Sequence, residues 1–302
     1  MTAVAAPLVA LGERSLTRFL ALTVVERLLL AVTTAVITVG LVLRLAIAWL
    51  DIETLVLKVM PDDAFYYLLT AERITSGQGI SFDGIHAANG YHPLWLFALV
   101  PVYLLPGREL PLHVALSLAA VFDIASGCFV GLTVAKLSAS RTAGLFALTT
   151  YTLLPRNVVA SVSGMETSLA AMLLAALLYV IVSVWREERH GWLRWAGGTG
   201  ALGGLTVLAR LDSAVTVAAV FALIALFQPG ARRWLAPTVS AATAAIITLP
   251  WFLWSWVAIG TPGPRAVTRR RGEPASSTRP SNRTRARPPQ SETVCCTQSE
   301  SS

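Results

Sequence analysis

The run LLLAVTTAVITVGLVLRLAIAWL, residues 28–50, decides the fold class. A helix that crosses the hydrocarbon core of a membrane needs about 20 apolar residues, and this run carries a single charged side chain, Arg44. The run is too long for the core of a signal peptide, and no small-residue cleavage site follows it. We therefore expect it to be retained as a membrane anchor.

Further apolar runs continue this pattern along the chain. Of the 302 residues, 55% are hydrophobic and 14% are charged, and the mean hydropathy is +0.63. This composition is too apolar for a soluble globular protein. The sequence predicts an all-α polytopic membrane protein of about seven transmembrane helices, the others lying at Pro111–Leu137, Thr142–Ser161, Met165–Trp185, Trp195–Leu211, Ser213–Gln228 and Trp234–Val257.

The orientation depends on the short apolar run Pro93–Pro106, which suits a re-entrant or interfacial helix better than a full crossing. If this run does not cross, the positive-inside rule is satisfied. The N-terminus is then cytoplasmic, and residues 51–110 form a long, helical extracytoplasmic loop. The positive charges placed in the cytoplasm are Arg14, Arg18, Lys136, Arg141, Arg186, Arg189, Arg194, Arg232 and Arg233.

The chain divides into a transmembrane domain, residues 1–260, and a tail, residues 261–302. Most of the net charge of +7 belongs to the tail, which holds 8 Arg and 3 Glu. The basic isoelectric point is therefore no sign of nucleic acid binding. The tail is rich in Arg, Pro, Ser and Thr, so we expect it to be disordered. We interpret it as the product of a truncation or a shifted reading frame that replaces the natural continuation.

The predicted outer loop opens with PDDAFYYLLTAERITSGQGISFDG, residues 61–84, and closes with NGYHPLW, residues 89–95. Asp62 and Asp63 precede a predicted helix that runs to about Ser76, on which Asp62, Tyr66, Leu69 and Arg73 share one stripe. The two acids either cap this helix or perform chemistry. Capping needs only one carboxylate, whereas an acidic pair can bind a metal or serve as a base, and we favour the second interpretation.

The segment 61–95, the later SGMETSL at residues 163–169 and the closing LPWFLWSWVAIGTPGP at residues 249–264 resemble the GT-C superfamily of membrane glycosyltransferases. Its members include relatives of the protein O-mannosyltransferases and of the lipid A aminoarabinose transferases. The resemblance implies transfer of a hexose or pentose from a polyprenyl-phosphate donor to a glycan, lipid or protein acceptor. Transfer would take place at the outer face of the cell membrane, with inversion.

This resemblance places the catalytic carboxylate at Asp62, with Asp63 beside it, and adds an acidic residue of the second outer loop, Glu166. Asp62 and Asp63 would supply the base or hold a divalent cation such as Mg²⁺ or Mn²⁺. Glu166 also fits the Ser-x-x-Glu capping box that begins at Ser163, and the two roles are compatible.

The leaving phosphate needs cationic partners, and the candidates outside the membrane are Arg73, Arg156 and Arg210. Arg210 is the strongest candidate of the three. Pairing with Asp212, or snorkelling of its long side chain towards water, would also explain an arginine at this position. His92 precedes Pro93 and is equally suited to begin a helix or to bind substrate.

Two other residues receive structural interpretations. Trp95 suits an interfacial aromatic belt. Asp123, in the middle of an apolar run, is costly in lipid, and we predict that it pairs with Arg44.

Two alternative functions stay open. One is a transporter or flippase of envelope lipids, although transporters usually place charges near the middle of the bilayer within repeated halves. The other is an inactive, truncated member of the superfamily. The sequence shows no arrangement typical of a Ser-His-Asp catalytic triad, no cluster of Cys and His at metal-ligand spacing and no nucleotide-binding fingerprint.

Overall fold

The computed structural model describes residues 23–107, 109–185 and 191–260, all of them within one compact unit, Met1–Val267. Within these ranges every regular element is helical, apart from an isolated antiparallel bridge between Ser81 and Ala87. The predicted all-α fold is therefore confirmed. The tail and its predicted disorder lie outside the described residues.

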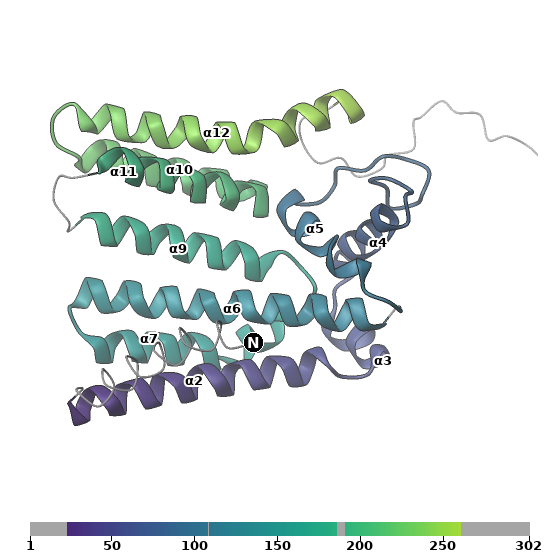
Figure 1. Ribbon diagram of the computed structural model, residues 1–302, viewed down its shortest axis with the longest axis horizontal. Coiled ribbons are helices and arrows are strands. Elements are labelled where there is room, and N and C mark those ends of the chain that lie inside the picture. Colours follow the sequence, from purple (N-terminus) through teal and green to yellow (C-terminus); the bar gives the residue numbers. More distant parts are fainter. Residues whose placement is uncertain (1–22, 108, 186–190, 261–302) are drawn as a thin grey trace, which may run out of the picture. The chain divides into compact units, whose positions relative to one another are not determined.

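Figure 1 shows long helices lying side by side, with shorter helices gathered at one end. Among the described residues, each predicted span corresponds to helix: α2 (Val24–Ala48), α6 (Glu109–Ser138), α7 (Arg141–Leu153) with α8 (Pro155–Ser161), α9 (Thr167–Trp185), α10 (Trp192–Ala209), α11 (Ala214–Phe227) and α12 (Arg232–Ile259).

Three of these helices, α2, α6 and α12, are long and apolar enough to cross a membrane by length and composition. Shorter apolar segments lie at Thr167–Ser183 and Leu211–Phe227. The predicted number of about seven crossings, and the side on which each loop lies, stay predictions.

Helix α2 begins a turn before the apolar run that predicted it. The side chain of Thr23 accepts a hydrogen bond from the Glu26 amide, and the Glu26 carboxylate accepts one from the Thr23 amide at 3.1 Å. This reciprocal pair is a capping box, which satisfies two of the free amides at a helix start.

The predicted span Thr142–Ser161 is broken into two helices at Pro155. Proline lacks an amide hydrogen and restricts the preceding residue, so Leu154 takes an extended ψ of 119°. The break frees the backbone carbonyls of Tyr151 and Thr152. The Asn157 side chain donates to the first at 3.1 Å, and Nη1 of Arg44 donates to the second at 2.9 Å.

The predicted pair of Arg44 and Asp123 is present and buried between α2 and α6. Nε and Nη2 of Arg44 both donate to Oδ2 of Asp123, at 2.9 and 2.6 Å, and the Arg44 side chain is fully enclosed. The Tyr151 hydroxyl donates to the other carboxylate oxygen at 2.9 Å. Because both charges are paired and hydrogen-bonded, they can lie inside an apolar bundle.

Glycines allow α10 and α12 to approach closely. A Cβ atom at Gly200 would lie 2.3 Å from the backbone oxygen of Ser240, and one at Gly204 would lie 3.0 Å from that of Ala244. The Ser240 hydroxyl also donates to the backbone oxygen of Ala196 at 2.9 Å. Small residues four positions apart are a common way to pack helices in membranes.

The predicted outer loop contains short helices at one end of the long ones (Figure 1): α3 (Ile52–Thr54), the π-helical segment η1 (Leu55–Val59), α4 (Ala64–Thr75), α5 (Pro93–Leu99) and the 3-10 segment η2 (Val102–Leu104). Helix α5 begins at Pro93 with His92 before it, as predicted. The run Pro93–Pro106 thus forms only a short helix and one turn.

Trp95 corrects one expectation, because it does not belong to an aromatic belt facing lipid. Its side chain is fully buried in the main core, and its Nε1–H donates to the backbone oxygen of Gly164 at 2.9 Å. Burying the indole with its N–H paired joins α5 to the loop before α9. This contact helps to position the neighbouring Glu166.

Candidate functional site

Glu166 lies directly before α9, in the loop that Trp95 holds, and only 2% of its surface is exposed. Its Oε1 atom lies 3.4 Å from Nη1 of Arg210 and 3.7 Å from Nε2 of His92. Three residues predicted from distant parts of the sequence therefore meet at one point. We call Glu166, His92, Arg210, Tyr67 and Asp212 the Glu166 cluster.

The proton of His92 is assigned by its neighbours. The backbone N–H of Leu211 donates to Nδ1 of His92 at 3.2 Å, so Nδ1 must carry a lone pair. The proton of the neutral ring is then on Nε2, which faces Glu166. Burial lowers the pKa of His92 below its ordinary value of 6.5, and the Arg210 charge acts in the same direction, while Glu166 opposes them.

Arg210 lies in the short connection between α10 and α11, and its guanidinium has two acidic partners. Nε and Nη2 donate to the carboxylate of Asp212 at 3.1 and 3.0 Å, while Nη1 faces Glu166. The predicted pairing with Asp212 is thus present, together with the contact to the buried acid. A bidentate pair of this kind fixes the plane of the guanidinium.

Tyr67 was not among the predicted site residues, and it belongs to the cluster. It is a buried residue of α4, and its hydroxyl oxygen accepts a hydrogen bond from the His92 amide at 3.3 Å. Burial raises the pKa of this phenol, and the nearby carboxylate of Glu166 raises it further, both through its charge and through its contact with the hydroxyl. No sequence signal pointed to this contact, because its partner His92 lies in a separate segment of the chain.

The Glu166 carboxylate does not form the capping box that its sequence suggested. Helix α9 does begin at Thr167, yet no hydrogen bond joins the side chains of Ser163 and Glu166 within the described part of the chain. The Oε2 atom of Glu166 is buried without a hydrogen-bond partner among these residues. A buried, unsatisfied carboxylate oxygen is costly in a fold and suits a residue that meets a ligand.

Asp62 and Asp63 precede α4, and both are exposed. Asp63 stands at the N-cap position, yet its side chain makes no capping hydrogen bond. The capping interpretation is therefore wrong for Asp63. Ala64, the next residue, packs against the loop before α9, because a Cβ atom at Gly164 would lie 3.2 Å from that of Ala64. The backbone next to the acidic pair therefore contacts the loop that carries Glu166, while no hydrogen bond or ion pair among the described residues joins either carboxylate to the cluster.

The other two predicted arginines are not in the cluster. Arg73 lies on α4 and donates through Nη1 to the side chain of Gln78. Arg156 is exposed in the first turn of α8 and makes no hydrogen bond or ion pair with the residues that the structure describes. A role for either in phosphate binding stays a prediction.

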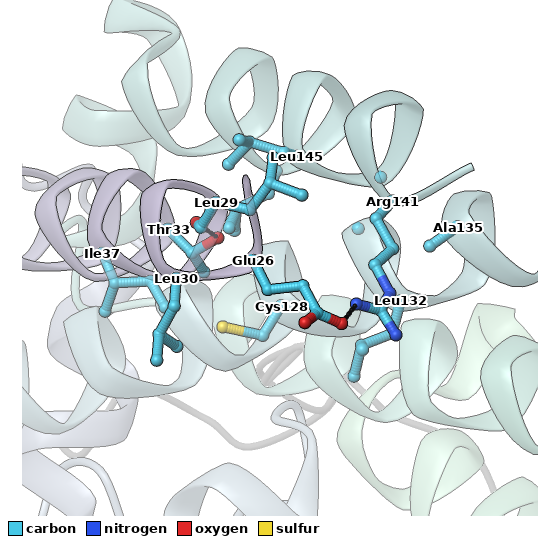
Figure 2. A pocket seen from close by; sticks show the side chains of 13 residues that line it. Glu26, Leu29, Leu30, Thr33, Ile37, Cys128, Leu132, Ala135, Arg141 and Leu145 are labelled. Atoms are coloured by element: carbon cyan, nitrogen blue, oxygen red, sulfur yellow. Dashed lines mark hydrogen bonds and ion pairs between the residues drawn. The ribbon is translucent and has the colours of Figure 1, made fainter. Parts of the chain in front are cut away.

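A pocket of about 530 Å³ lies elsewhere, between α2, α6 and α7 (Figure 2). Leucine is the most frequent residue type in its lining, and the ion pair of Arg141 with Glu26, at 2.8 Å, lies along one side. Arg141 begins α7 and Glu26 is in the first turn of α2, whereas the Glu166 cluster lies where α9 and α11 begin. This pocket therefore contains none of the predicted site residues.

The fold and the cluster together define a class: a helical membrane protein in which a buried acidic group meets partly exposed basic and imidazole groups beside one end of its long helices. Residues 107–256 match the family described as dolichyl-phosphate-mannose-protein mannosyltransferase. This family is of GT-C type, and the match confirms the resemblance to that superfamily for this segment.

The matched segment contains Glu166, Arg210 and Asp212, and it begins after Asp62, Asp63 and His92. Comparison with curated proteins and with solved structures gives no match. The matched family points to glycosyltransferase activity, and together with the apolar helices it suggests a membrane protein.

Proposed function

We propose that the protein transfers a sugar from a polyprenyl-phosphate donor to an acceptor of the cell envelope, at the outer face of the plasma or inner membrane. The description of the matched family names a dolichyl-phosphate donor, which supports a lipid phosphate as the carrier of the sugar. The observation that carries the proposal is the buried Glu166 with its unpaired Oε2 atom, 3.4 Å from the guanidinium of Arg210.

The chemistry is a single displacement with inversion. The acceptor hydroxyl attacks the anomeric carbon, and its proton passes to the carboxylate of Asp62, which acts as the general base with Asp63 beside it. The bond between the anomeric carbon and the phosphate oxygen breaks, and its electron pair stays on the phosphate. Arg210 stabilises the charge that develops on that oxygen.

The remaining cluster residues position these groups. Glu166 and Asp212 hold the guanidinium of Arg210 from two sides, as their distances of 3.4 and 3.0 Å support. His92, hydrogen-bonded to the Leu211 amide, fixes the backbone beside Arg210. The unpaired oxygen of Glu166 accepts a hydrogen bond from a hydroxyl group of the donor sugar.

The alternative role for the acidic pair is to hold a divalent cation instead of serving as the base. Asp62 and Asp63 provide two carboxylates, and the described residues contain no group of three or more potential metal-ligating side chains. Two carboxylates suit Mg²⁺ or Mn²⁺ better than a structural zinc site, since Mg²⁺ is commonly held by one or two carboxylates together with substrate phosphates. Such an ion would neutralise charge on the donor phosphate.

The test uses the full-length chain in proteoliposomes with a set of radiolabelled polyprenyl-phosphate sugars and an envelope extract as acceptor. We expect Asp62→Asn to lower transfer by roughly 10²- to 10⁴-fold, as for loss of a general base. Arg210→Gln should lower it by about 10²-fold or more. Unchanged transfer in Asp62→Asn would overturn the assignment of the base.

The matched controls are Glu53→Gln and Arg194→Gln. Glu53 is an exposed carboxylate of α3, and Arg194 is an exposed residue in the first turn of α10. Neither belongs to the cluster, so both variants should transfer sugar at the rate of the unmodified chain. A chain that binds polyprenyl phosphate yet transfers no sugar from any donor would support the inactive-member alternative.

A further inference from the structure

A second pocket, of about 810 Å³, lies on another face of α4 from the one that carries Tyr67. Phe65, Leu68 and Glu72 line it from α4, at spacings of three and four residues that place them on one side of a helix. Its volume falls within the range of roughly 300–1,000 Å³ that is usual for pockets enclosing small organic molecules.

The lining combines apolar side chains with polar ones. Ile52 and Val56 contribute aliphatic side chains, and so does Leu112, a buried residue at the start of α6. Phe65 and Tyr103 add two aromatic rings. A further set supplies a carboxylate, a guanidinium and an amide: Glu72, Arg73 and Gln78.

Some of these polar groups lack partners. The Nε–H of Arg73 is buried without a hydrogen-bond acceptor in the described part of the chain, although Nη1 donates to Gln78. The half-buried carboxylate of Glu72 makes no hydrogen bond or ion pair among the same residues. Among the described residues the pocket therefore presents both a donor and an acceptor without partners, and leaving such groups unpaired is unfavourable unless a ligand or water meets them.

This combination discriminates between ligand classes. A prenyl chain would cover the apolar side chains but would leave Glu72 and Arg73 unpaired and desolvated. A phosphate would suit Arg73 but would be repelled by the carboxylate of Glu72. A saccharide meets both requirements, because its hydroxyls donate and accept hydrogen bonds while its C–H faces pack on aromatic rings.

We propose that this pocket binds a saccharide of at least two rings, and that this saccharide is the acceptor. Its role as acceptor rests on the proposed glycosyl transfer, whereas the binding itself does not. The pocket adjoins the segment that carries the proposed base: Asp62 lies just before α4, and its backbone oxygen accepts a hydrogen bond at 3.2 Å from the amide of Phe65, which lines the pocket. The ring nearest Asp62 would offer the hydroxyl that attacks the donor.

The binding test is saturation-transfer difference NMR on the full-length chain in lipid nanodiscs, which avoid glycosidic detergents. The probes are the disaccharides mannobiose, cellobiose and lactose, without any donor. We expect at least one of them to bind. Glu72→Gln and Arg73→Gln should each weaken that binding by roughly tenfold or more, since each removes a hydrogen bond to a charged group.

The matched control is again Glu53→Gln, the same change at an exposed carboxylate that does not line the pocket. It should bind the disaccharide as the unmodified chain does. Thermal unfolding of each variant, followed by intrinsic tryptophan fluorescence, identifies any change that merely unfolds the protein, and Arg73→Lys provides a milder variant if Arg73→Gln unfolds.

The outcomes separate the two proposals. Disaccharide binding that Glu72→Gln weakens and Glu53→Gln leaves intact supports the pocket, even if no donor gives transfer. Transfer that Asp62→Asn abolishes, with no disaccharide bound, would uphold the enzyme and overturn the saccharide pocket. Binding of a Ser/Thr-rich peptide that is sensitive to Glu72→Gln, with no disaccharide bound, would overturn it in favour of a protein acceptor.

Discussion

The Nη1 atom of Arg210 lies 3.4 Å from the Oε1 atom of Glu166, although α9 and α10 separate the two residues in the sequence. The acid is buried and the guanidinium is partly exposed, so the pair links the protein interior to the site where a charged substrate can approach. Asp212 holds the same guanidinium from the other side. This geometry makes Glu166 a residue whose charge affects Arg210 directly.

Glu166→Gln should reduce sugar transfer by about tenfold to a hundredfold, because it removes the charge that orients Arg210 while keeping the shape of the side chain. The turnover number should fall more than the donor KM changes if Glu166 acts mainly in the transition state. Initial rates in proteoliposomes over a range of donor concentrations provide the measurement. Equal rates for Glu166→Gln and Glu53→Gln would contradict this role.

The stability of the protein should fall in acid, partly because of His92. Its pKa is lowered in the folded state below the ordinary value of 6.5, so the unfolded chain binds a proton more readily. This contribution to stability is complete above about pH 6.5 and is lost as the pH falls from there towards the lower pKa of the folded state. Protonated Nδ1 could no longer accept the hydrogen bond of the Leu211 amide.

Thermal unfolding followed from roughly pH 7.5 down to roughly pH 5 measures the effect. The melting temperature of the His92→Gln variant should fall less over this range than that of the unmodified chain. His86→Gln is the control, because His86 is exposed and pairs locally with Asp83 at 2.8 Å. Parallel curves for the unmodified chain and His92→Gln would contradict the prediction.

Removing one partner of the buried pair should be more harmful than removing both. Arg44→Leu should destabilise the protein by about 3–5 kcal/mol, because it leaves the carboxylate of Asp123 buried and unpaired. The double variant with Asp123→Leu should recover much of this loss, although the freed carbonyl of Thr152 remains without Arg44. Melting temperatures in one detergent compare the three proteins. A double variant less stable than Arg44→Leu would contradict the argument.

Gly200→Ala should destabilise the packing of α10 against α12 by about 1–3 kcal/mol, the usual cost of overpacking. The added methyl group would lie 2.3 Å from a backbone oxygen, so one helix must move. Gly198→Ala is the matched control on the same helix, since a Cβ atom there would have no neighbour within 4 Å. It should be neutral or stabilising, because alanine favours helix.

Chelation provides a test of the proposed cation. Transfer should stop in EDTA and return with Mg²⁺ or Mn²⁺, whereas Asp62→Asn should not recover. Calorimetry gives a second readout: Mn²⁺ should bind the chain with polyprenyl phosphate present, and Asp63→Asn should weaken this binding. Full transfer in EDTA, with no heat of Mn²⁺ binding, would contradict the cation.

The sequence predicted the long helices well, because apolar runs report directly on burial and helix length. It predicted the pairing of Arg44 with Asp123 for the same reason, since an apolar run tolerates a charge only with a partner. The break at Pro155 was missed, because the residues on both sides of it belong to one apolar run. Trp95 was also misplaced, because interfacial and buried tryptophans share a sequence pattern and differ only in tertiary contacts.

The site was predicted in part. Glu166, His92 and Arg210 were chosen separately, and only the fold shows that they meet. Tyr67 was missed because a tyrosine in an amphipathic helix carries no signal of which partner it faces. The second face of α4, with its pocket, could not be predicted, since its lining comes from segments as distant as Ile52, Glu72 and Leu112.

The bond from Arg44 to the carbonyl of Thr152 has an evolutionary consequence. Pro155 ends α7 and so creates the need for a donor, and Arg44, on another helix, supplies it. The two positions should therefore change together among homologues. Relatives in which a residue other than proline continues the helix at position 155 would no longer need an arginine at position 44, and Asp123 should be lost with it.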